Sequence, residues 1–453
     1  MTLTLICHVV KACLQLSRGS VIDELFAMAR RIMVLSSGME PIVIPPDITS
    51  PVELAAGLRH LPGFCWFDNC ADGHGRWGGD WIAAMPAEWR TGRWPEQAPP
   101  EPNDGEFWAG TIDYDGSWEF ARFTEWLHRP LGSESWLGCG DLCRWWRAQA
   151  HSPTSSAAPV WSETSASRAE FVAMVERAQE WIAAGDIYQV NLARRFRLGW
   201  DAAISGWALY RRLREISPAP HAAYLRQRTR AVLSASPETF LDRAGTELRT
   251  RPIKGTRPRG ATEAEDARLR AELAASPKER AELIMITDLE RNDLGRVACT
   301  GSVHVESLCA LESFPQVHHQ VSLVRGTLAP DTQWAAIWDA MFPGGSITGA
   351  PKKRAMEIIA ALEPCPRGLY TGAIGWMHGP DQGCFSIAIR TALWQDATLE
   401  FHAGSGIVEG SEPAAEYEET LHKASGLATA FGLPWPPPDR SLDAHHSPPI
   451  MPP

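Results

Sequence analysis

The sequence has no excess of basic residues and no long apolar segment. It carries 54 Asp and Glu against 43 Lys and Arg, a net charge of −11, whereas a nucleic-acid-binding surface needs cationic side chains against phosphates. No apolar run approaches the roughly 20 residues of a membrane-spanning helix. The apolar start at 1–16 is interrupted by Lys11 and lacks the basic beginning of a secretory signal. We therefore expect a cytoplasmic protein that binds neither nucleic acid nor membrane.

Common signatures of metal and catalytic sites are also missing. The ten cysteines include no C-x2-C pair, which zinc modules use, so we expect reduced thiols. There is no G-x-S-x-G elbow, no H-E-x-x-H and no G-x-G-x-x-G after a strand. The glycine-rich stretch 343–352 is not a phosphate loop, because Ala350 and Pro351 separate Gly349 from Lys352.

The composition changes along the 453 residues, which exceed one ordinary hydrophobic core. We expect a poorly integrated leader at 1–38, an N-terminal subdomain at 39–150, a Ser-, Thr-, Ala- and Pro-rich linker at 151–167, a larger domain at 168–433 and a disordered tail at 434–453. Strand and helix patterns occur in mixed clusters, without strict βαβ order. This order favours an α+β fold with antiparallel sheets covered by helices.

Helical patterns are clearest in the larger domain. Apolar residues recur at helical spacing in 168–184, and helix-forming text runs from 263 to 289 with an interruption at Ser276 and Pro277. Further helices are predicted at 206–216, 351–362 and 413–431.

Lys254 lies in the Pro-Ile-Lys-Gly-Thr segment 252–256, an extended run stiffened by proline. Such a mount suits a side chain that must meet a substrate atom at bonding distance. A lysine is a nucleophile only as the neutral amine, so its site must lower the pKa from about 10.4 towards neutrality. Taken alone, an ordinary surface lysine is the commoner interpretation.

Four glutamates form two pairs at a spacing of three. Glu279 and Glu282 lie near a predicted helix start, and Glu416 and Glu419 lie in the last predicted helix, so each pair shares one helical face. Two such helices facing each other would give the oxygen-only ligand set that Mg²⁺ prefers. Solvated helix faces are the alternative for either pair alone. Lys423, one turn beyond Glu419, is a salt-bridge partner or an anion ligand.

The other polar candidates are single residues or short turns. Gly404-Ser405-Gly406 follows a strand pattern, and its backbone N–H groups either converge on an anion or make a tight turn. Arg390 interrupts an apolar strand and needs a partner, either a substrate carboxylate or a structural ion pair. Glu238 would be a general acid only if burial raised its pKa. For His319 and Tyr370, a satisfied core group is favoured until their positions are known.

Taken jointly, seven ordered segments are similar to those of one family. They are 185–192, 236–238, 252–256, 288–295, 343–352, 367–370 and 404–409. They resemble the chorismate-utilising enzymes, which include anthranilate synthase and aminodeoxychorismate synthase component I and the isochorismate and salicylate synthases. The resemblance is strong over 167–432 and weak over 40–150. It implies the chorismate-binding α+β fold, with sheets packed face to face and helices outside.

The resemblance also implies roles for the candidate residues. Four carboxylates would hold Mg²⁺ and connect it to one carboxylate of chorismate: Glu282 and Glu419, with Glu279 and Glu416 directly or through water. A second group would grip or adjoin the other carboxylate: Tyr370, Arg390, Gly404, Ser405 and Gly406, with Gly255, Thr256 and Lys423 nearby. Glu238 would protonate the departing C4 hydroxyl, and His319 would line the ring.

Within the family, the position of Lys254 would select the product. Anthranilate synthases typically read Pro-Ile-Ala-Gly-Thr there, whereas aminodeoxychorismate synthases read Pro-Ile-Lys-Gly-Thr. The lysine would add at C2 of chorismate as the C4 hydroxyl leaves, and ammonia would then add at C4 and expel it. The product would be 4-amino-4-deoxychorismate, a precursor of p-aminobenzoate and folate. Isochorismate-forming members use a water-activating lysine where this chain has Gln189, which argues against water as the nucleophile.

The resemblance further implies a partner. The sequence lacks the Gly-x-Cys-Leu-Gly nucleophile of a glutaminase, so ammonia would come from glutamine through a separate glutamine amidotransferase subunit. The Leu-Leu-Glu-Ser segment of the tryptophan pocket of anthranilate synthases corresponds to 66–69 here, Trp-Phe-Asp-Asn, and the Pro-Tyr-Met stretch is replaced near 220–222; both differences argue against tryptophan feedback. Anthranilate synthase component I is the alternative activity, and a non-catalytic docking or regulatory subunit is the alternative of another class.

Overall fold

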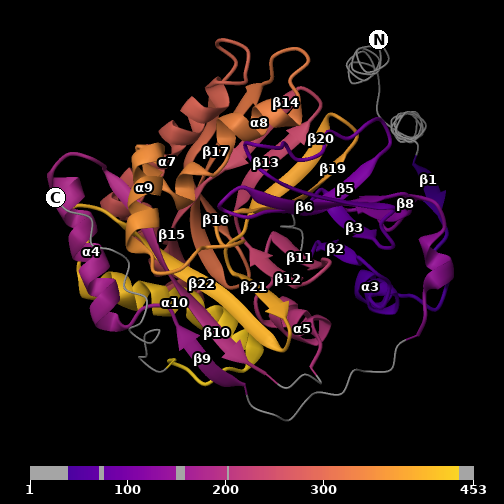
Figure 1. Cartoon of the computed structure of the whole chain (residues 1–453), viewed down its shortest axis with the longest axis horizontal. Coiled ribbons are helices and arrows are strands. Elements are labelled where there is room, and N and C mark those ends of the chain that lie inside the picture. Colours follow the sequence, from indigo (N-terminus) through magenta and orange to yellow (C-terminus); the bar gives the residue numbers. More distant parts are fainter. Residues whose placement is uncertain (1–38, 71–75, 149–158, 201–203, 438–453) are drawn as a thin grey trace.

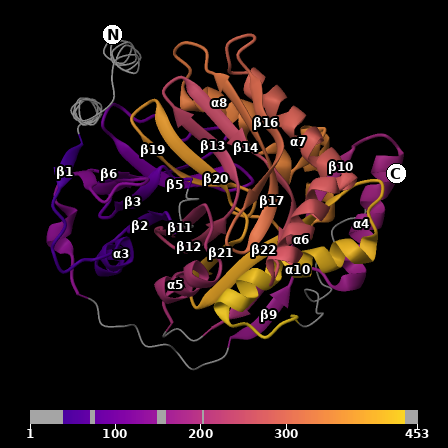
Figure 2. The same ribbon diagram turned by 180° about the vertical axis from the view of Figure 1, so that it is seen from behind.

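Two antiparallel sheets form the centre of the structure, and helices lie outside them (Figures 1 and 2). The computed structural model describes residues 39–70, 76–148, 159–200 and 204–437. The predicted leader at 1–38 and the last part of the predicted tail, 438–453, lie outside the described residues. The strand pairings are antiparallel in both sheets. The predicted α+β class, with antiparallel sheets and outer helices, is confirmed.

The sheets have twelve and ten strands. The order in the first is β1 (Glu40–Ile42), β8 (Trp136–Cys139), β7 (Trp126–Pro130), β3 (Gly79–Ala83), β2 (Cys65–Asp68), β11 (His221–Arg226), β12 (Ala231–Ser236), β21 (Thr391–Gln395), β22 (Thr398–Ile407), β10 (Gln189–Gly199) and β18 (Gly349–Ala350), with β9 (Val160–Thr164) also on β10. The order in the second is β15 (Ile253–Pro258), β17 (Val317–Thr327), β14 (Glu247–Arg251), β13 (Thr239–Ala244), β20 (Gln382–Ile387), β19 (Ala373–His378), β5 (Phe107–Ile112), β6 (Ser117–Phe123) and β4 (Glu88–Arg93), with β16 (His304–Ser313) also on β17.

The helices are α3 (Pro51–Leu58), α4 (Arg168–Ala183), α5 (Gly206–Ile216), α6 (Glu263–Ala275), α7 (Pro277–Gly295), α8 (Trp334–Met341), α9 (Lys352–Leu362) and α10 (Pro413–Phe431), with short 3-10 turns η1 (Leu142–Trp145) and η2 (Gly345–Ile347). Within the described part of the chain, no helix is both long and apolar enough to span a membrane.

The two sheets pack against each other through aromatic side chains. Trp81 on β3 stacks on Phe107 of β5, with 5.1 Å between ring centroids, and lies 4.4 Å from Trp376 of β19. On the outside of the second sheet, Trp338 of α8 lies 4.8 Å from Phe385 of β20. Large apolar and aromatic surfaces therefore leave water on both faces of that sheet, which is the main favourable term in folding.

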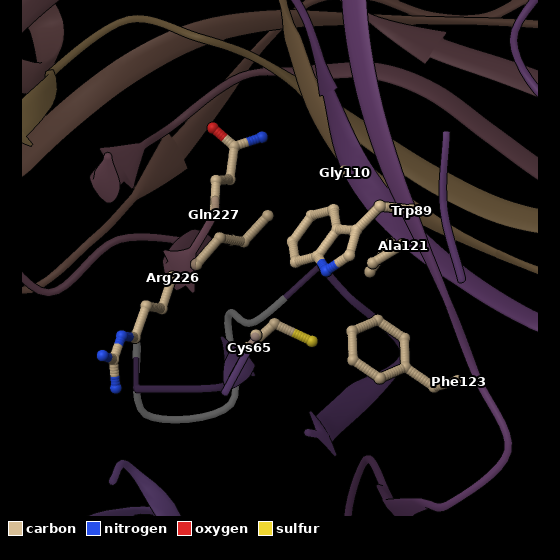
Figure 3. A pocket seen from close by; sticks show the side chains of 10 residues that line it. Cys65, Trp89, Gly110, Ala121, Phe123, Arg226 and Gln227 are labelled. Atoms are coloured by element: carbon tan, nitrogen blue, oxygen red, sulfur yellow. The ribbon is translucent and has the colours of Figure 1, made fainter. Parts of the chain in front are cut away.

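A small cavity remains between the two sheets near their N-terminal strands (Figure 3). Its volume is about 10 Å³, which is about the space of one water molecule. Residues from β2, β4, β5, β6 and β11 line it, among them Cys65, Trp89, Ala109, Phe123 and Leu225. It includes none of the predicted site residues.

The N-terminal residues 39–150 contribute strands to both sheets. Strand β2 pairs with β11 in the first sheet, and β5 pairs with β19 in the second. Figure 1 shows these indigo and purple strands beside later strands drawn in magenta and orange. The N-terminal subdomain and the larger domain therefore share hydrophobic clusters.

Two boundary predictions need correction. Strand β9 occupies Val160–Thr164, inside the predicted linker 151–167, because its backbone groups pair with β10. The predicted disordered tail also begins too early. Trp435 packs 6.2 Å from the ring of Phe196, and the carbonyl of Pro434 accepts a hydrogen bond from the Trp161 indole at 3.0 Å. Aromatic contacts between segments far apart in the sequence order both places.

Helix α7 and helix α10 bring the two glutamate pairs beside the sheets. Ser276 caps α7 by accepting a hydrogen bond from the Glu279 N–H, and Pro277 occupies the first helical position. Helix α7 packs on β15 and β17, and α10 packs along β22. Both helices therefore run next to the strands that carry Lys254 and the Gly404–Gly406 segment.

Candidate active site

Lys254 is at the centre of the site, on β15. Its Nζ donates a hydrogen bond to the backbone carbonyl of Ser346 in η2, at 2.9 Å. Burial lowers the pKa of the Lys254 amine, and the nearby carboxylates of Glu238 and Glu282 oppose that shift. The amine is therefore half-buried and held in place, and its neutral form is favoured relative to that of an ordinary lysine.

Glu238 lies beside the lysine, between β12 and β13, and is 5% exposed. Burial raises the pKa of its carboxyl, while a hydrogen bond with the Ser346 side chain and the charge of Lys254 oppose the shift. The Ile253 N–H also donates to this carboxyl. A carboxyl with a raised pKa retains its proton at higher pH, as a general acid requires.

His319 and Thr256 form a pair next to Lys254. The Thr256 hydroxyl and the His319 Nδ1 lie 2.9 Å apart, and His319 is 2% exposed. Burial, together with the charge of Arg390, lowers the pKa of His319 to about 3. The imidazole is therefore neutral near pH 7, which suits a wall of the site rather than a proton donor.

Gly255 separates Lys254 from Thr256 in the left-handed region, with φ of 76°. A Cβ at this position would lie 2.9 Å from the Leu273 side chain and 3.1 Å from Glu279. Both the backbone angle and the close approach of α6 and α7 therefore require glycine here.

Arg390 has strained backbone and no acidic partner among the described residues. Its φ is 47°, a conformation that is uncommon outside glycine and often occurs at functional sites. Burial lowers the pKa of its guanidinium, and no carboxylate compensates for this. The sequence left two partners open for Arg390, a substrate carboxylate or an acidic side chain of the chain itself. Among the described residues, no acidic side chain forms an ion pair with Arg390.

The Gly404–Gly406 segment lies inside β22, which corrects the expectation that it follows a strand. These residues pair with Asn191, Leu192 and Ala193 of β10 on one side. Strand β21 pairs with β22 only from Thr398 to Phe401, so no described strand covers the other side of the segment. The backbone of this segment therefore pairs with a neighbouring strand on one side only.

Tyr370 and Lys423 contact this segment. The Tyr370 hydroxyl lies 3.0 Å from the position that a Cβ on Gly404 would take, and its ring stacks on His402 at 5.2 Å. Lys423 on α10 donates to the Gly404 carbonyl at 3.1 Å and to Glu419 at 2.6 Å. Lys423 therefore connects the Gly404–Gly406 segment with the glutamates.

Glu282 and Glu419 act on each other across α7 and α10. Burial raises the pKa of Glu282, Lys254 opposes the shift, and the charge of Glu419 adds to it. For Glu419, burial raises the pKa, but the charges of Lys423, Lys278 and Lys254 and the Lys423 hydrogen bond together outweigh burial, so the net shift is downward. The two carboxylates therefore lie near enough for the charge of Glu419 to affect the pKa of Glu282.

Glu279 and Glu416 have other partners. Arg257 holds Glu279 at 2.7 Å. Glu416 is 3% exposed and accepts a hydrogen bond from the Ser411 hydroxyl at 2.6 Å, while its second oxygen has no partner in the described part of the chain. Lys278 lies 3.8 Å from Glu416.

The four-glutamate metal set stays a prediction. Across the described ranges, no three His, Cys, Asp or Glu side chains are arranged to hold a metal ion. Three of the glutamates have a cationic neighbour: Arg257 beside Glu279, Lys278 beside Glu416 and Lys423 beside Glu419. The donor chemistry still fits a hard cation, since Glu416 has an unpartnered buried oxygen and Glu282 and Glu419 repel each other.

Two residues of the site were not recognised from the sequence, Ser346 and Arg367. The Ser346 carbonyl accepts from Lys254, and the Ser346 side chain hydrogen-bonds with Glu238. Arg367 is buried, and its guanidinium lies over the Tyr370 ring. Arg367 pairs with Glu363 at 2.7 Å and donates to the carbonyls of Ile347 and Asn191. Both residues lie in segments that carry the family resemblance, which was the only available signal.

Asp68, in the segment 66–69, forms an ion pair with Arg214 of α5. Asp68 is fully buried and accepts hydrogen bonds from the Tyr210 hydroxyl at 2.9 Å and from Arg214 at 2.5 Å. One oxygen of the Asp68 carboxylate therefore already has its partners within the chain.

Comparisons with known proteins agree with this geometry. The model of the chorismate binding enzyme family matches residues 124–429. Anthranilate synthase component 1 of Streptomyces coelicolor is 47% identical over 263 residues, covering 58% of this chain and 51% of that protein. Aminodeoxychorismate synthase component 1 of Klebsiella aerogenes is 45% identical over 317 residues, covering 69% of each chain. The matched region of this chain thus spans about half the length of the first relative.

A solved structure supports the same fold. The menaquinone-specific isochorismate synthase of Escherichia coli aligns with a TM-score of 0.71 and 19% identity, over 87% of this chain and 94% of that one. The family model covers well over half of the sequence. Lys254, Glu238 and Ser346 come from three of the segments that carry the resemblance, and they lie together. The chain belongs to the chorismate-binding enzyme family.

Proposed function

We propose that the chain is the synthase component that converts chorismate and ammonia to 4-amino-4-deoxychorismate in the cytoplasm. The observation that carries the proposal is the placement of Lys254 and Glu238 on the same Ser346 turn. One of them has a lowered pKa and the other a raised pKa. Opposite shifts of this kind separate a nucleophile from a general acid.

In this proposal, Lys254 acts at C2 of the ring and Glu238 acts at the hydroxyl on C4. Glu238 gives its proton to the C4 hydroxyl, which leaves as water, while the Lys254 amine forms a bond to C2 and the double bonds shift. Ammonia then adds at C4, the C2–N bond breaks, and Lys254 leaves as the amine. The Glu238 carboxylate regains its proton from the added nitrogen. The net change is replacement of the hydroxyl by an amino group.

Arg390, Tyr370 and the backbone of Gly404, Ser405 and Gly406 would bind one carboxylate of chorismate. The proposal is supported by the unpaired Arg390 guanidinium beside His319. A guanidinium binds a carboxylate through two parallel hydrogen bonds. Gly255, Thr256 and Lys423 would adjoin this group, and His319 would contact the ring.

The change Arg390→Gln should raise the KM for chorismate by roughly 10- to 100-fold, because a hydrogen bond to a charged group is worth about 1.5–3 kcal/mol. The kcat should change much less. Steady-state kinetics measures both, with Arg291→Gln as the control, since Arg291 is exposed on α7 and pairs with Asp288. An unchanged KM would show that Arg390 has a structural role.

The glutamates would hold Mg²⁺ in this proposal. Glu282 and Glu419 would be direct ligands, and Glu279 and Glu416 would bind directly or through water once Arg257 and Lys278 give way. When bound, the ion would supply positive charge for the second carboxylate of chorismate.

Glu282→Gln and Glu419→Gln should each weaken Mg²⁺ binding by at least about tenfold, since affinity follows the number of charged ligands. Isothermal titration with Mg²⁺ alone measures this without the reaction. Glu418→Gln is the matched control, because Glu418 is half-exposed on the same helix. Unaltered Mg²⁺ affinity in both site variants would remove the metal assignment.

The ammonia would come from a separate glutamine amidotransferase subunit, and the product would feed p-aminobenzoate and folate. The alternative product is anthranilate, which is favoured by the 47% identity with the anthranilate synthase of Streptomyces coelicolor. Lys254 is the residue that distinguishes the two products, since it would occupy C2 where the 2-amino product needs nitrogen.

Purified protein incubated with chorismate, Mg²⁺ and ammonium tests the proposal. We expect 4-amino-4-deoxychorismate, identified by chromatography and mass spectrometry. Fluorescent anthranilate as the sole product would establish the alternative. If folded, Mg²⁺-loaded protein does not consume chorismate, a docking or regulatory role gains support.

A further inference from the structure

Helix α7 contacts the segment 341–352 at Gly345 and at Lys352. Glu290, which is 2% exposed, accepts a hydrogen bond from the Gly345 N–H at 2.9 Å. One turn later, Asp293 pairs with Lys352 at 2.5 Å, and Lys352 also donates to the carbonyl of Met341 at 3.2 Å. The helix therefore holds the segment at two points, and Lys352 connects the second point back to Met341.

The middle contact adjoins the reacting groups. Gly345, which Glu290 holds, precedes Ser346, whose carbonyl accepts from Lys254 and whose side chain hydrogen-bonds with Glu238. One backbone turn thus lies between Glu290 on one side and Lys254 and Glu238 on the other. A displacement of the turn would move both contacts together.

The turn also packs tightly against α7. A Cβ on Gly345 would lie 2.6 Å from the Leu289 side chain and 3.2 Å from the Glu290 carboxylate. Glycine is therefore required here for the close approach of turn and helix, and it allows Glu290 to reach the backbone N–H directly.

The burial of Glu290 lowers the stability of the fold. Its second carboxyl oxygen is buried and has no partner among the described residues, and an unsatisfied buried polar group costs about 1–3 kcal/mol. Burial raises the pKa of Glu290 to about 7, while Lys352 opposes the shift. Such a group in the middle of a packed helix face calls for an explanation beyond packing.

We propose that Glu290 is a positioning residue, which fixes the Gly345–Ile347 turn so that Ser346 holds the Lys254 amine and the Glu238 carboxyl in register with each other. This inference rests on the proposed function, because that function makes Lys254 and Glu238 the reacting pair. The carboxylate acts through its hydrogen bond to Gly345 and does not itself touch the substrate.

Three variants separate positioning from charge and from folding. Glu290→Gln keeps an oxygen that can accept from Gly345, Glu290→Asp keeps the charge but is one methylene too short, and Glu290→Ala removes both. Asp288→Ala is the control, because Asp288 is exposed on the same helix. Thermal unfolding of each variant shows whether it is folded at the assay temperature.

The first readout is total consumption of chorismate, whichever product forms. We expect kcat to fall by roughly 10- to 100-fold in Glu290→Ala and Glu290→Asp with KM within about threefold, since misplacement of about 1 Å costs about 10²-fold. Glu290→Gln should stay within about threefold of the wild type. The second readout is the rate at which an amine-acylating reagent labels Lys254, which should rise in the Ala and Asp variants only.

Two results would overturn the inference. One is wild-type kcat in folded Glu290→Asp, together with an unchanged Lys254 labelling rate. The other is equal loss in Glu290→Gln and Glu290→Asp, which would assign the effect to charge or packing. If the wild type makes only anthranilate, the proposed function fails, but both readouts still report on Glu290.

Discussion

Replacing Lys254 with alanine should abolish formation of 4-amino-4-deoxychorismate and lower chorismate consumption by roughly 10³-fold, equivalent to about 4 kcal/mol of barrier. The amine is half-buried, is held by the Ser346 carbonyl and lies in the field of Glu238, Glu282 and Glu419. Without it, no group of the chain occupies C2, so any residual amination should move towards the 2-amino product. Product analysis by mass spectrometry after incubation with ammonium measures both changes.

The covalent step has its own measurement. With ammonia withheld, wild-type protein given chorismate should gain the mass of chorismate less one water on the peptide that contains Lys254. Lys353→Ala serves as the control, because Lys353 is exposed at the start of α9. An unchanged product profile in Lys254→Ala would rule out the covalent mechanism.

Glu238→Gln should lower kcat by about 10²- to 10⁴-fold, the usual contribution of a general acid. Burial raises the pKa of Glu238. The wild-type rate should fall as the pH rises through this raised pKa, because the carboxyl then loses its proton. A glutamine cannot titrate, and this alkaline limb of the profile should disappear in the variant. Rates of chorismate consumption across pH measure it.

The low-pH side of the profile gives an internal control. Burial lowers the pKa of Lys254, and protonation of the amine below that value should reduce the rate in both the wild type and Glu238→Gln. If the alkaline limb persists in the variant, another group supplies the proton.

Helices with clear periodicity or caps were predictable from the sequence. The expected helix 206–216 coincides with α5, and the interruption at Ser276 and Pro277 separates α6 from α7. Helix α8 was missed because its sequence is apolar almost throughout, which removes the periodic signal. Strand β9 was missed because its strand character comes from pairing with β10 rather than from its own composition.

The candidate site shows the same division. Titratable side chains such as Lys254, Glu238 and Glu282 could be selected because their chemistry is visible in the residue type. The contact of Lys254 and Glu238 with Ser346 could not be predicted from the sequence. The Ser346 carbonyl is a backbone group, and its position depends on α7. Likewise, the sequence places Glu279 one turn from Glu282, but only the structure shows that Arg257 holds it.

The contribution of residues 39–150 to both sheets has a consequence for how this chain can be divided. Strands β2 and β5 cover β11 and β19. A fragment that starts at residue 168 would leave both of those strands as long, apolar, open edges, which are templates for pairing with other chains. We therefore expect residues 168–433 not to fold without 39–150, so that insertion, fusion or exchange with a relative has to keep both parts together.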